Sequence, residues 1–225
     1  SALGPALEGI DAVMHFAAYA RVDESTEHPD RYHENNVEVT GRLVRAAQQA
    51  GVRRFIFSSS CAVYGSPDAD HLPVREETPL RPDNPYGASK ANAETLVRDL
   101  ARDGSFALGI LRYFNVIGSD PERILDDPAV DTRLLSACLR TARGEREQFT
   151  IFGTDYDTPD GTAVRDFVHV SDIASAHVAL LERLESGADL TFNVGCGRAA
   201  SVREIIRATE AVTGRPVPVA VGPRR

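Results

Sequence analysis

The sequence predicts an α/β protein built on a doubly wound parallel sheet, followed by a smaller C-terminal lobe. Two observations predict it. Short apolar runs that suit strands buried on both faces alternate with longer segments of helical spacing. After Arg112 this alternation gives way to a loop rich in Asp, Pro and Gly, which indicates a second unit. A parallel sheet of this kind has right-handed crossovers and binds ligands beyond the carboxyl ends of its strands.

The first part of the chain supplies three strands and two helices. Valines and alanines at helical spacing follow Asn35 and Asn36, which suit an N-cap, and Gly51 suits the end of that helix. The predicted elements are a strand at 12–18, this first helix, a strand at 54–58, a helix at 86–102 and a strand at 107–111.

The second part is less regular. Ser171 or Asp172 is expected to cap a helix that runs through Leu184. The other predicted elements are a helix at 133–143 and strands at 149–152, 166–170 and 191–194.

Composition excludes several classes of protein. The 225 residues carry a formal charge of -8, which argues against a nucleic-acid-binding surface. No apolar run is long enough to cross a membrane, so a cytoplasmic protein is expected. The three cysteines lie far apart, which predicts neither a disulfide framework nor a metal site.

The sharpest local motif is Tyr86-Gly-Ala-Ser-Lys90. A spacing of four residues on a helix places the phenol and the ammonium on one face. A nearby cation lowers the pKa of a phenol, so Lys90 is expected to help Tyr86 act as a base. The run Ser58-Ser59-Ser60 ends a predicted strand, where a hydroxyl can reach a ligand.

Several motifs occur in the order that one known family uses. They include His15-Phe-Ala-Ala18, the run from Phe57 to Gly65, Pro85 to Lys90, Leu111 to Val116 and Asp160 to Asp166. On these residues the chain resembles the extended short-chain dehydrogenase/reductases, and among them the UDP-glucose 4-epimerase group. The resemblance implies a Rossmann-type domain with a C-terminal substrate lobe, the cofactor NAD, a UDP-sugar substrate and a homodimer.

The resemblance also implies roles for single residues. Tyr86 is expected to be the acid/base on the sugar 4-hydroxyl, Lys90 to hold the nicotinamide ribose, and Ser60 to hydrogen-bond the reacting oxygen. The implied cofactor contacts are Phe16, Ala17, Ala18, Asn35, Ser58, Tyr86, Lys90 and Tyr113. The implied substrate contacts are Ser60, Asn115, Leu134, Phe152, Arg165 and Arg225.

The function expected from this resemblance is 4-epimerisation of a nucleotide sugar by transient oxidation at C4. Related dehydratases and decarboxylases place a carboxylate directly after the residue matched by Ser60, whereas this chain has Cys61 and Ala62. Alternatives are a UDP-pentose 4-epimerase, suggested by the run from Arg112 to Glu122, or a non-catalytic nucleotide-sugar or dinucleotide-binding module.

The Gly-rich phosphate-binding turn of such folds belongs to a first strand-helix unit that the sequence does not contain. The resemblance therefore implies missing segments at both ends, about 60 residues of them upstream if each strand-helix unit takes roughly 30. Residues 1–112 with part of 160–185 are expected to be the remainder of the NAD-binding domain. Residues 113–225 are expected to form mainly the nucleotide-sugar-binding lobe.

Overall fold

The computed structural model describes residues 3–120, 122 and 134–224. The chain divides into two compact units. The first unit comprises Ser1–Phe114 and Ile173–Val194, and the second comprises Asn115–Asp172 and Gly195–Arg225.

The first unit is built on a parallel four-stranded sheet. Its strands lie in the order β1-β2-β3-β7, and each neighbouring pair is parallel. The strands are β1 (Ala12–His15), β2 (Arg54–Ser60), β3 (Ala107–Tyr113) and β7 (Asp189–Val194). The predicted α/β class with a parallel sheet is confirmed.

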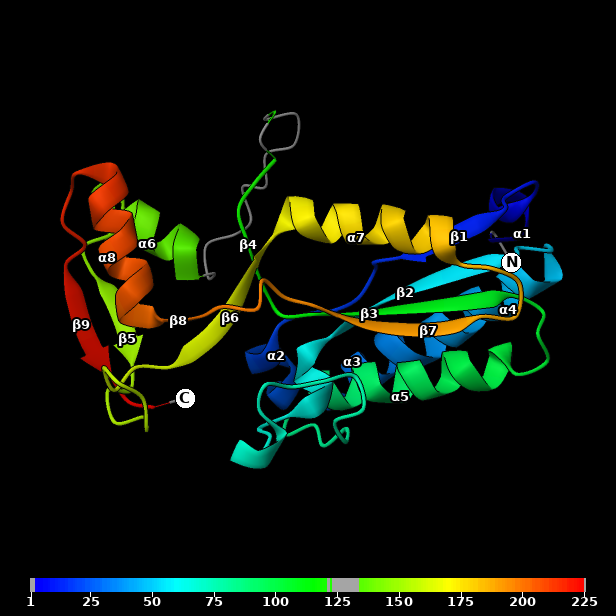
Figure 1. Ribbon diagram of the computed structural model, residues 1–225, viewed down its shortest axis with the longest axis horizontal. Coiled ribbons are helices and arrows are strands. Elements are labelled where there is room, and N and C mark those ends of the chain that lie inside the picture. The colour runs from blue at the N-terminus through cyan, green and yellow to red at the C-terminus, as the bar shows by residue number, and fades with distance from the viewer. Residues whose placement is uncertain (1–2, 121, 123–133, 225) are drawn as a thin grey trace. The chain divides into compact units, whose positions relative to one another are not determined.

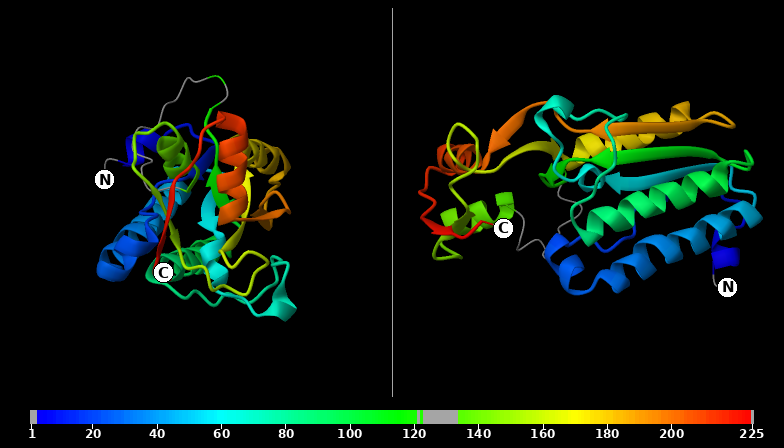
Figure 2. Two further views of the ribbon diagram at one scale, coloured as in Figure 1. Left: turned by 90° about the vertical axis from the view of Figure 1, so that its left-hand side faces the viewer. Right: turned by 90° about the horizontal axis from the view of Figure 1, so that it is seen from below.

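Helices cover both faces of this sheet, as Figures 1 and 2 show. On one face α4 (Thr40–Gln49) and α5 (Pro85–Ala101) pack against Phe55 and Phe57, and on the other α7 (Val170–Arg183) packs against Ile56. Because successive side chains of a strand point to opposite faces, an unbroken apolar run fills both cores. The unit also contains α1 (Leu3–Leu7), α2 (Val22–Glu27), α3 (Pro29–His33), η1 (Glu34–Val39), η2 (Cys61–Tyr64) and η3 (Ala69–His71).

The described residues of the second unit form two small sheets and the helices α6 and α8. Its elements are the sheet β4 (Asn115–Ile117), β6 (Val164–His169) and β8 (Ala199–Ser201), the pair β5 (Phe149–Phe152) and β9 (Val219–Gly222), and the helices α6 (Leu134–Ala142) and α8 (Val202–Thr213). The sequence analysis missed β4, β8, β9 and α8. A signal for α8 was present, because Ser201 and Glu204 have the spacing of a capping box and form one.

The interpretation of Asn35 as a helix N-cap is wrong. Asn35 and Asn36 lie inside the π-helical segment η1, which continues α3 into α4 without a break. Such π turns are frequently found at functional sites. Ser171 and Asp172 likewise lie inside α7 rather than before it.

Several strand boundaries also differ from the prediction: β3 ends at Tyr113, and β6 and β7 each begin two residues earlier than expected. β1 ends at His15, so residues 16–18 follow the strand, and β2 extends through Ser60. In the described part of the chain, no helix is both long and apolar enough to span a membrane.

Candidate active site

The carboxyl edge of the first unit's sheet gathers most of the predicted cofactor and catalytic residues. Ser60, the last residue of β2, is paired with Tyr113, the last residue of β3. Phe16 directly follows β1, and its side chain is 57% exposed. Ligands bind at this edge in parallel α/β sheets.

Helix α5 presents Tyr86 and Lys90 to the same region. The helix begins with Pro85, and the side chain of Asn84 caps it by accepting the N–H of Gly87 at 2.9 Å. Lys90 is buried, and its Nζ donates to the carbonyl of Ser58 at 2.7 Å. The same Nζ lies 4.8 Å from the centre of the Phe57 ring. This contact joins α5 to the end of β2.

The pKa of Tyr86 differs from the expectation. Burial raises it above the ordinary value of a phenol, and a hydrogen bond from Ser60 only partly opposes this. Burial is the largest cause of the shift, and the ammonium of Lys90 donates to the carbonyl of Ser58. The pKa of Tyr86 is thus raised rather than lowered, and the expected role of Lys90 in tuning this phenol stays a prediction.

Burial also acts on Lys90 itself. Desolvation lowers the pKa of its ammonium to about 8, and the carboxylate of Glu94 opposes that fall. Lys90 therefore remains mainly protonated at neutral pH.

A hydrogen-bonded chain runs from Ser58 to His177, which the sequence analysis did not single out. The Tyr113 hydroxyl lies 2.8 Å from the Ser58 Oγ and 2.7 Å from Nε2 of His177. His177 Nδ1 lies 2.9 Å from the Ile173 carbonyl, so Nδ1 carries the proton and Tyr113 donates to Nε2. The His177 ring packs on exposed Phe16 at 4.6 Å.

Asn36 is a second residue near the site that the sequence did not indicate. It is 1% exposed, and its side chain hydrogen-bonds the backbone N–H and carbonyl of Tyr19 and the hydroxyl of Ser89. The neighbouring Asn35 is half-buried and donates to the Asn36 Oδ1 at 3.0 Å. Asn36 thus ties the segment after β1 to α5.

Gly87 allows α5 to approach the backbone that follows Ser60. A Cβ at this position would lie 2.4 Å from the carbonyl oxygen of Ala62. Gly87→Ala is therefore expected to lower the free energy of unfolding by about 1–3 kcal/mol, measured by urea denaturation. The control is Gly4→Ala in α1, where nothing lies within 4 Å of the added carbon, so stability is expected not to fall. Equal stability of the two variants would contradict this close approach.

Apart from Ser60, the predicted substrate contacts belong to the second unit. Asn115 and Arg165 are exposed, and Arg165 lies on the same face of β6 as Phe167, which pairs with Asn115. Phe152 ends β5 and is 36% exposed, and Leu134 begins α6. Arg225 lies outside the described residues.

Comparison with known proteins places this geometry in a family. Residues 1–195 match the model of the NAD dependent epimerase/dehydratase family. The chain belongs to that family.

Individual relatives agree with this assignment. A UDP-glucose 4-epimerase of Azospirillum brasilense is 46% identical over 96% of the chain and 62% of its own length. UDP-arabinose 4-epimerase 1 of Arabidopsis thaliana is 43% identical over 96% of the chain and 52% of its own length. The chain thus spans between half and two thirds of the curated relatives it matches.

A solved structure of a UDP-glucose 4-epimerase from Stenotrophomonas maltophila, with bound NAD and formylated UDP-arabinopyranose, gives a TM-score of 0.93. It is 39% identical, and the match covers 100% of this chain and 68% of that one.

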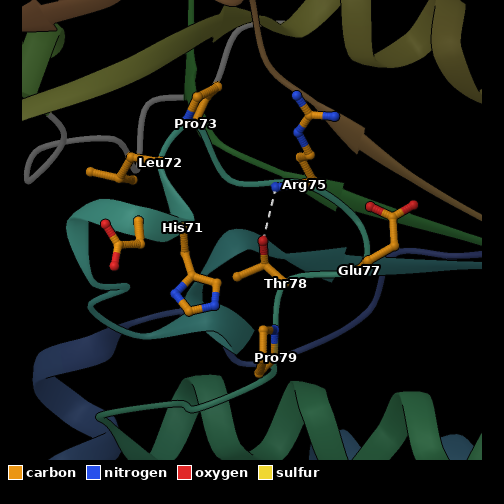
Figure 3. A pocket seen from close by; sticks show the side chains of 8 residues that line it. His71, Leu72, Pro73, Arg75, Glu77, Thr78 and Pro79 are labelled. Carbon is orange, nitrogen blue, oxygen red and sulfur yellow. Dashed lines mark hydrogen bonds between the residues drawn. The ribbon is translucent and has the colours of Figure 1, made fainter.

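The protein also has a surface hollow that is lined by none of the predicted catalytic residues. The loop from Asp70 to Pro79 forms it, with a volume of about 370 Å³ (Figure 3). Within the loop, the Arg75 N–H donates to the Thr78 hydroxyl at 3.0 Å. None of the predicted site residues lines this hollow. We therefore locate the candidate site by its side chains at the sheet edge.

Proposed function

We propose that the protein is an NAD-dependent 4-epimerase of a nucleotide sugar of the UDP-glucose/UDP-galactose type. The observation that carries the proposal is the position of Ser60, Tyr86 and Lys90. The Ser60 hydroxyl, at the end of a parallel strand, lies near enough to the Tyr86 phenol to lower its pKa, and the helix bearing that phenol also carries a buried ammonium. This set suits proton transfer to and from a sugar hydroxyl.

The residues at the sheet edge fit NAD. The Lys90 ammonium has three hydrogens, and among the described residues Ser58 accepts one of them. Hydrogens thus remain available for ribose hydroxyls, and the exposed ring of Phe16 offers a flat apolar surface. Ala17, Ala18, Asn35, Ser58 and Tyr113 complete the proposed cofactor contacts. When bound, NAD supplies a hydride acceptor for C4 of the sugar and returns the hydride to its other face.

Tyr86 and Ser60 are proposed to carry out the proton transfer at the sugar 4-hydroxyl. Tyr86 takes the proton of the 4-hydroxyl as hydride leaves C4, and gives it back in the return step. Burial raises the pKa of this phenol, so a positive charge near it would favour its role as a base, and bound NAD would supply one in its oxidised nicotinamide. Ser60 holds the reacting oxygen beside the phenol.

We assign the nucleotide sugar to the second unit and NAD to the first. Asn115, Arg165 and Arg225 are proposed to bind the diphosphate-sugar, because amide and guanidinium groups donate well to phosphate oxygens. Phe152 and Leu134 are proposed to contact the nucleotide. A homodimer and a cytoplasmic location complete the proposal, and size-exclusion chromatography with light scattering tests the assembly.

A second candidate is a UDP-pentose 4-epimerase. The 43% identity to a UDP-arabinose 4-epimerase and the similarity to a structure that holds formylated UDP-arabinopyranose favour it. Both candidates use the same proposed chemistry at C4 and differ in the sugar. Dehydration is disfavoured, because Cys61 and Ala62 stand where such enzymes need an added acid or base.

The test is to measure the intact mass and absorbance of the purified protein, incubate it with UDP-galactose or UDP-arabinose, and separate the products. Bound NAD and a 4-epimer of one sugar are expected, and the preferred sugar chooses between the two candidates. Tight binding of the nucleotide sugar without any turnover would contradict the proposal and indicate a binding module.

A further inference from the structure

A group of buried charges lies behind the carboxyl end of β2. Lys90 is 4% exposed, Arg112 on β3 is 4% exposed, and Glu94, one turn beyond Lys90 on α5, is 2% exposed. Among the described residues, Glu94 is the only buried carboxylate. Buried charges are costly unless they are paired. The Glu94 carboxylate is therefore the counter-charge for both Lys90 and Arg112.

Glu94 and Arg112 form a two-pronged ion pair. Arg112 donates from Nε to Oε1 at 3.0 Å and from Nη2 to Oε2 at 2.7 Å. Its Nη1 donates to the Tyr64 hydroxyl at 2.7 Å and to the Glu76 carbonyl at 3.0 Å. A guanidinium keeps its proton in proteins, so Lys90 is the cation that would lose its charge if the carboxylate were removed.

Glu94 also reaches the strand that carries Ser60. The hydroxyl of Ser59 donates to Glu94 Oε1 at 2.5 Å, and Lys90 Nζ donates to the carbonyl of Ser58 at 2.7 Å. Two residues one turn apart on α5 thus bind consecutive residues of β2, directly before Ser60. Any sliding of α5 along β2 would break both contacts and separate Tyr86 from Ser60.

We propose that Glu94 is a positioning residue for the reaction: it keeps the buried Lys90 charged and, through Ser59, fixes Ser60 beside Tyr86. This inference rests on the proposed function and extends it to a residue that touches neither substrate nor cofactor. Arg112 limits the effect of Glu94 on Lys90, because Arg112 is paired with the same carboxylate.

The other titratable groups around Lys90 are neutral at neutral pH. Burial lowers the pKa of His15 on β1 to about 4 and raises the pKa of Tyr113 on β3 to about 12. The pKa of Tyr86 is also raised. Glu94 is therefore the charged group that raises the pKa of Lys90, and Arg112 is paired with that same carboxylate.

Lys90 is the one lysine in the 225-residue sequence, which permits a direct test. Selective isotope labelling of lysine gives a side-chain NMR signal that is assigned by its loss in Lys90→Arg, and whose pH titration reports the pKa of Lys90. In Glu94→Gln this pKa is expected to fall from about 8 by about one unit or more, because the shape is kept and the negative charge is lost. In Arg112→Gln it is expected to rise, because Glu94 then faces a single cation.

Opposite shifts in the two variants separate this role from a structural one, because a loosened core would move both pKa values toward the ordinary lysine value. An unchanged pKa in Glu94→Gln, a shift of the same sign in both variants, or a wild-type Lys90 that titrates like an exposed lysine would overturn the proposal. Circular dichroism shows which variants are folded. If one variant is unfolded, the pKa of Lys90 in the other variant and in the wild type tests the proposal.

Turnover provides the second readout. Glu94→Gln is expected to lower kcat more than it raises KM, and to move the alkaline limb of kcat to lower pH as Lys90 loses its proton earlier. Normal kcat and an unchanged alkaline limb would overturn the positioning role. If the wild-type protein turned over no nucleotide sugar while the NMR shifts appeared as expected, the proposed function would fail and the charge-holding role of Glu94 would stand.

Discussion

Replacing Tyr86 with phenylalanine is expected to lower turnover of the nucleotide sugar at least about a hundredfold, because a phenyl ring can neither accept nor return the proton of the 4-hydroxyl. Binding of the nucleotide sugar is expected to change much less, since the ring and the helix are kept. Steady-state kinetics and equilibrium binding measure the two effects.

The matched control is Tyr156→Phe, which removes a tyrosine hydroxyl from the second unit. The ring on which Arg224 packs at 3.9 Å is kept, so turnover is expected to stay within about twofold of wild type. If Tyr86→Phe and Tyr156→Phe behaved alike, Tyr86 would not be the acid/base.

Replacing Arg112 with methionine is expected to cost about 3–5 kcal/mol of the free energy of unfolding. The change leaves the Glu94 carboxylate buried opposite an apolar side chain, with the Ser59 hydroxyl as a remaining donor. Urea denaturation at constant m-value measures the loss.

The double variant Arg112→Met/Glu94→Leu separates charge from packing. Because a buried ion pair can often be replaced by apolar residues at little cost, this variant is expected to recover most of the lost stability. Turnover is not expected to recover, since Ser59 and Lys90 lose their partner. A double variant as unstable as Arg112→Met would contradict the interpretation that an unpaired buried charge causes the loss.

The sequence predicted the first unit well because its elements are buried on both faces. An apolar run such as Phe55–Phe57 and a motif such as Tyr86 to Lys90 depend on local periodicity, which a single sequence displays. The strand boundaries were less accurate: β2 continues through three serines, because pairing with β3 extends the strand beyond its apolar part.

What the sequence could not predict depends on contacts between distant residues. Glu94 and Arg112 are ordinary charged residues of a helix and a strand until the fold buries them together. His177 acquires a role only because α7 brings it against Tyr113, 64 positions earlier in the chain. The pKa of Tyr86 was predicted with the wrong sign because spacing indicated the Lys90 charge but not the depth of burial. The β4, β8 and β9 strands are too short for a periodic signal.

The most direct test of the central claim is to follow the hydrogen on C4. The protein is incubated in ordinary water with UDP-galactose that carries deuterium at C4, and the product is analysed by NMR and mass spectrometry. We predict UDP-glucose that keeps the deuterium at C4, because the hydrogen removed from that carbon is the one returned to it within a closed site. A 4-epimer that has exchanged its deuterium for a solvent proton would contradict epimerisation by transient oxidation at C4.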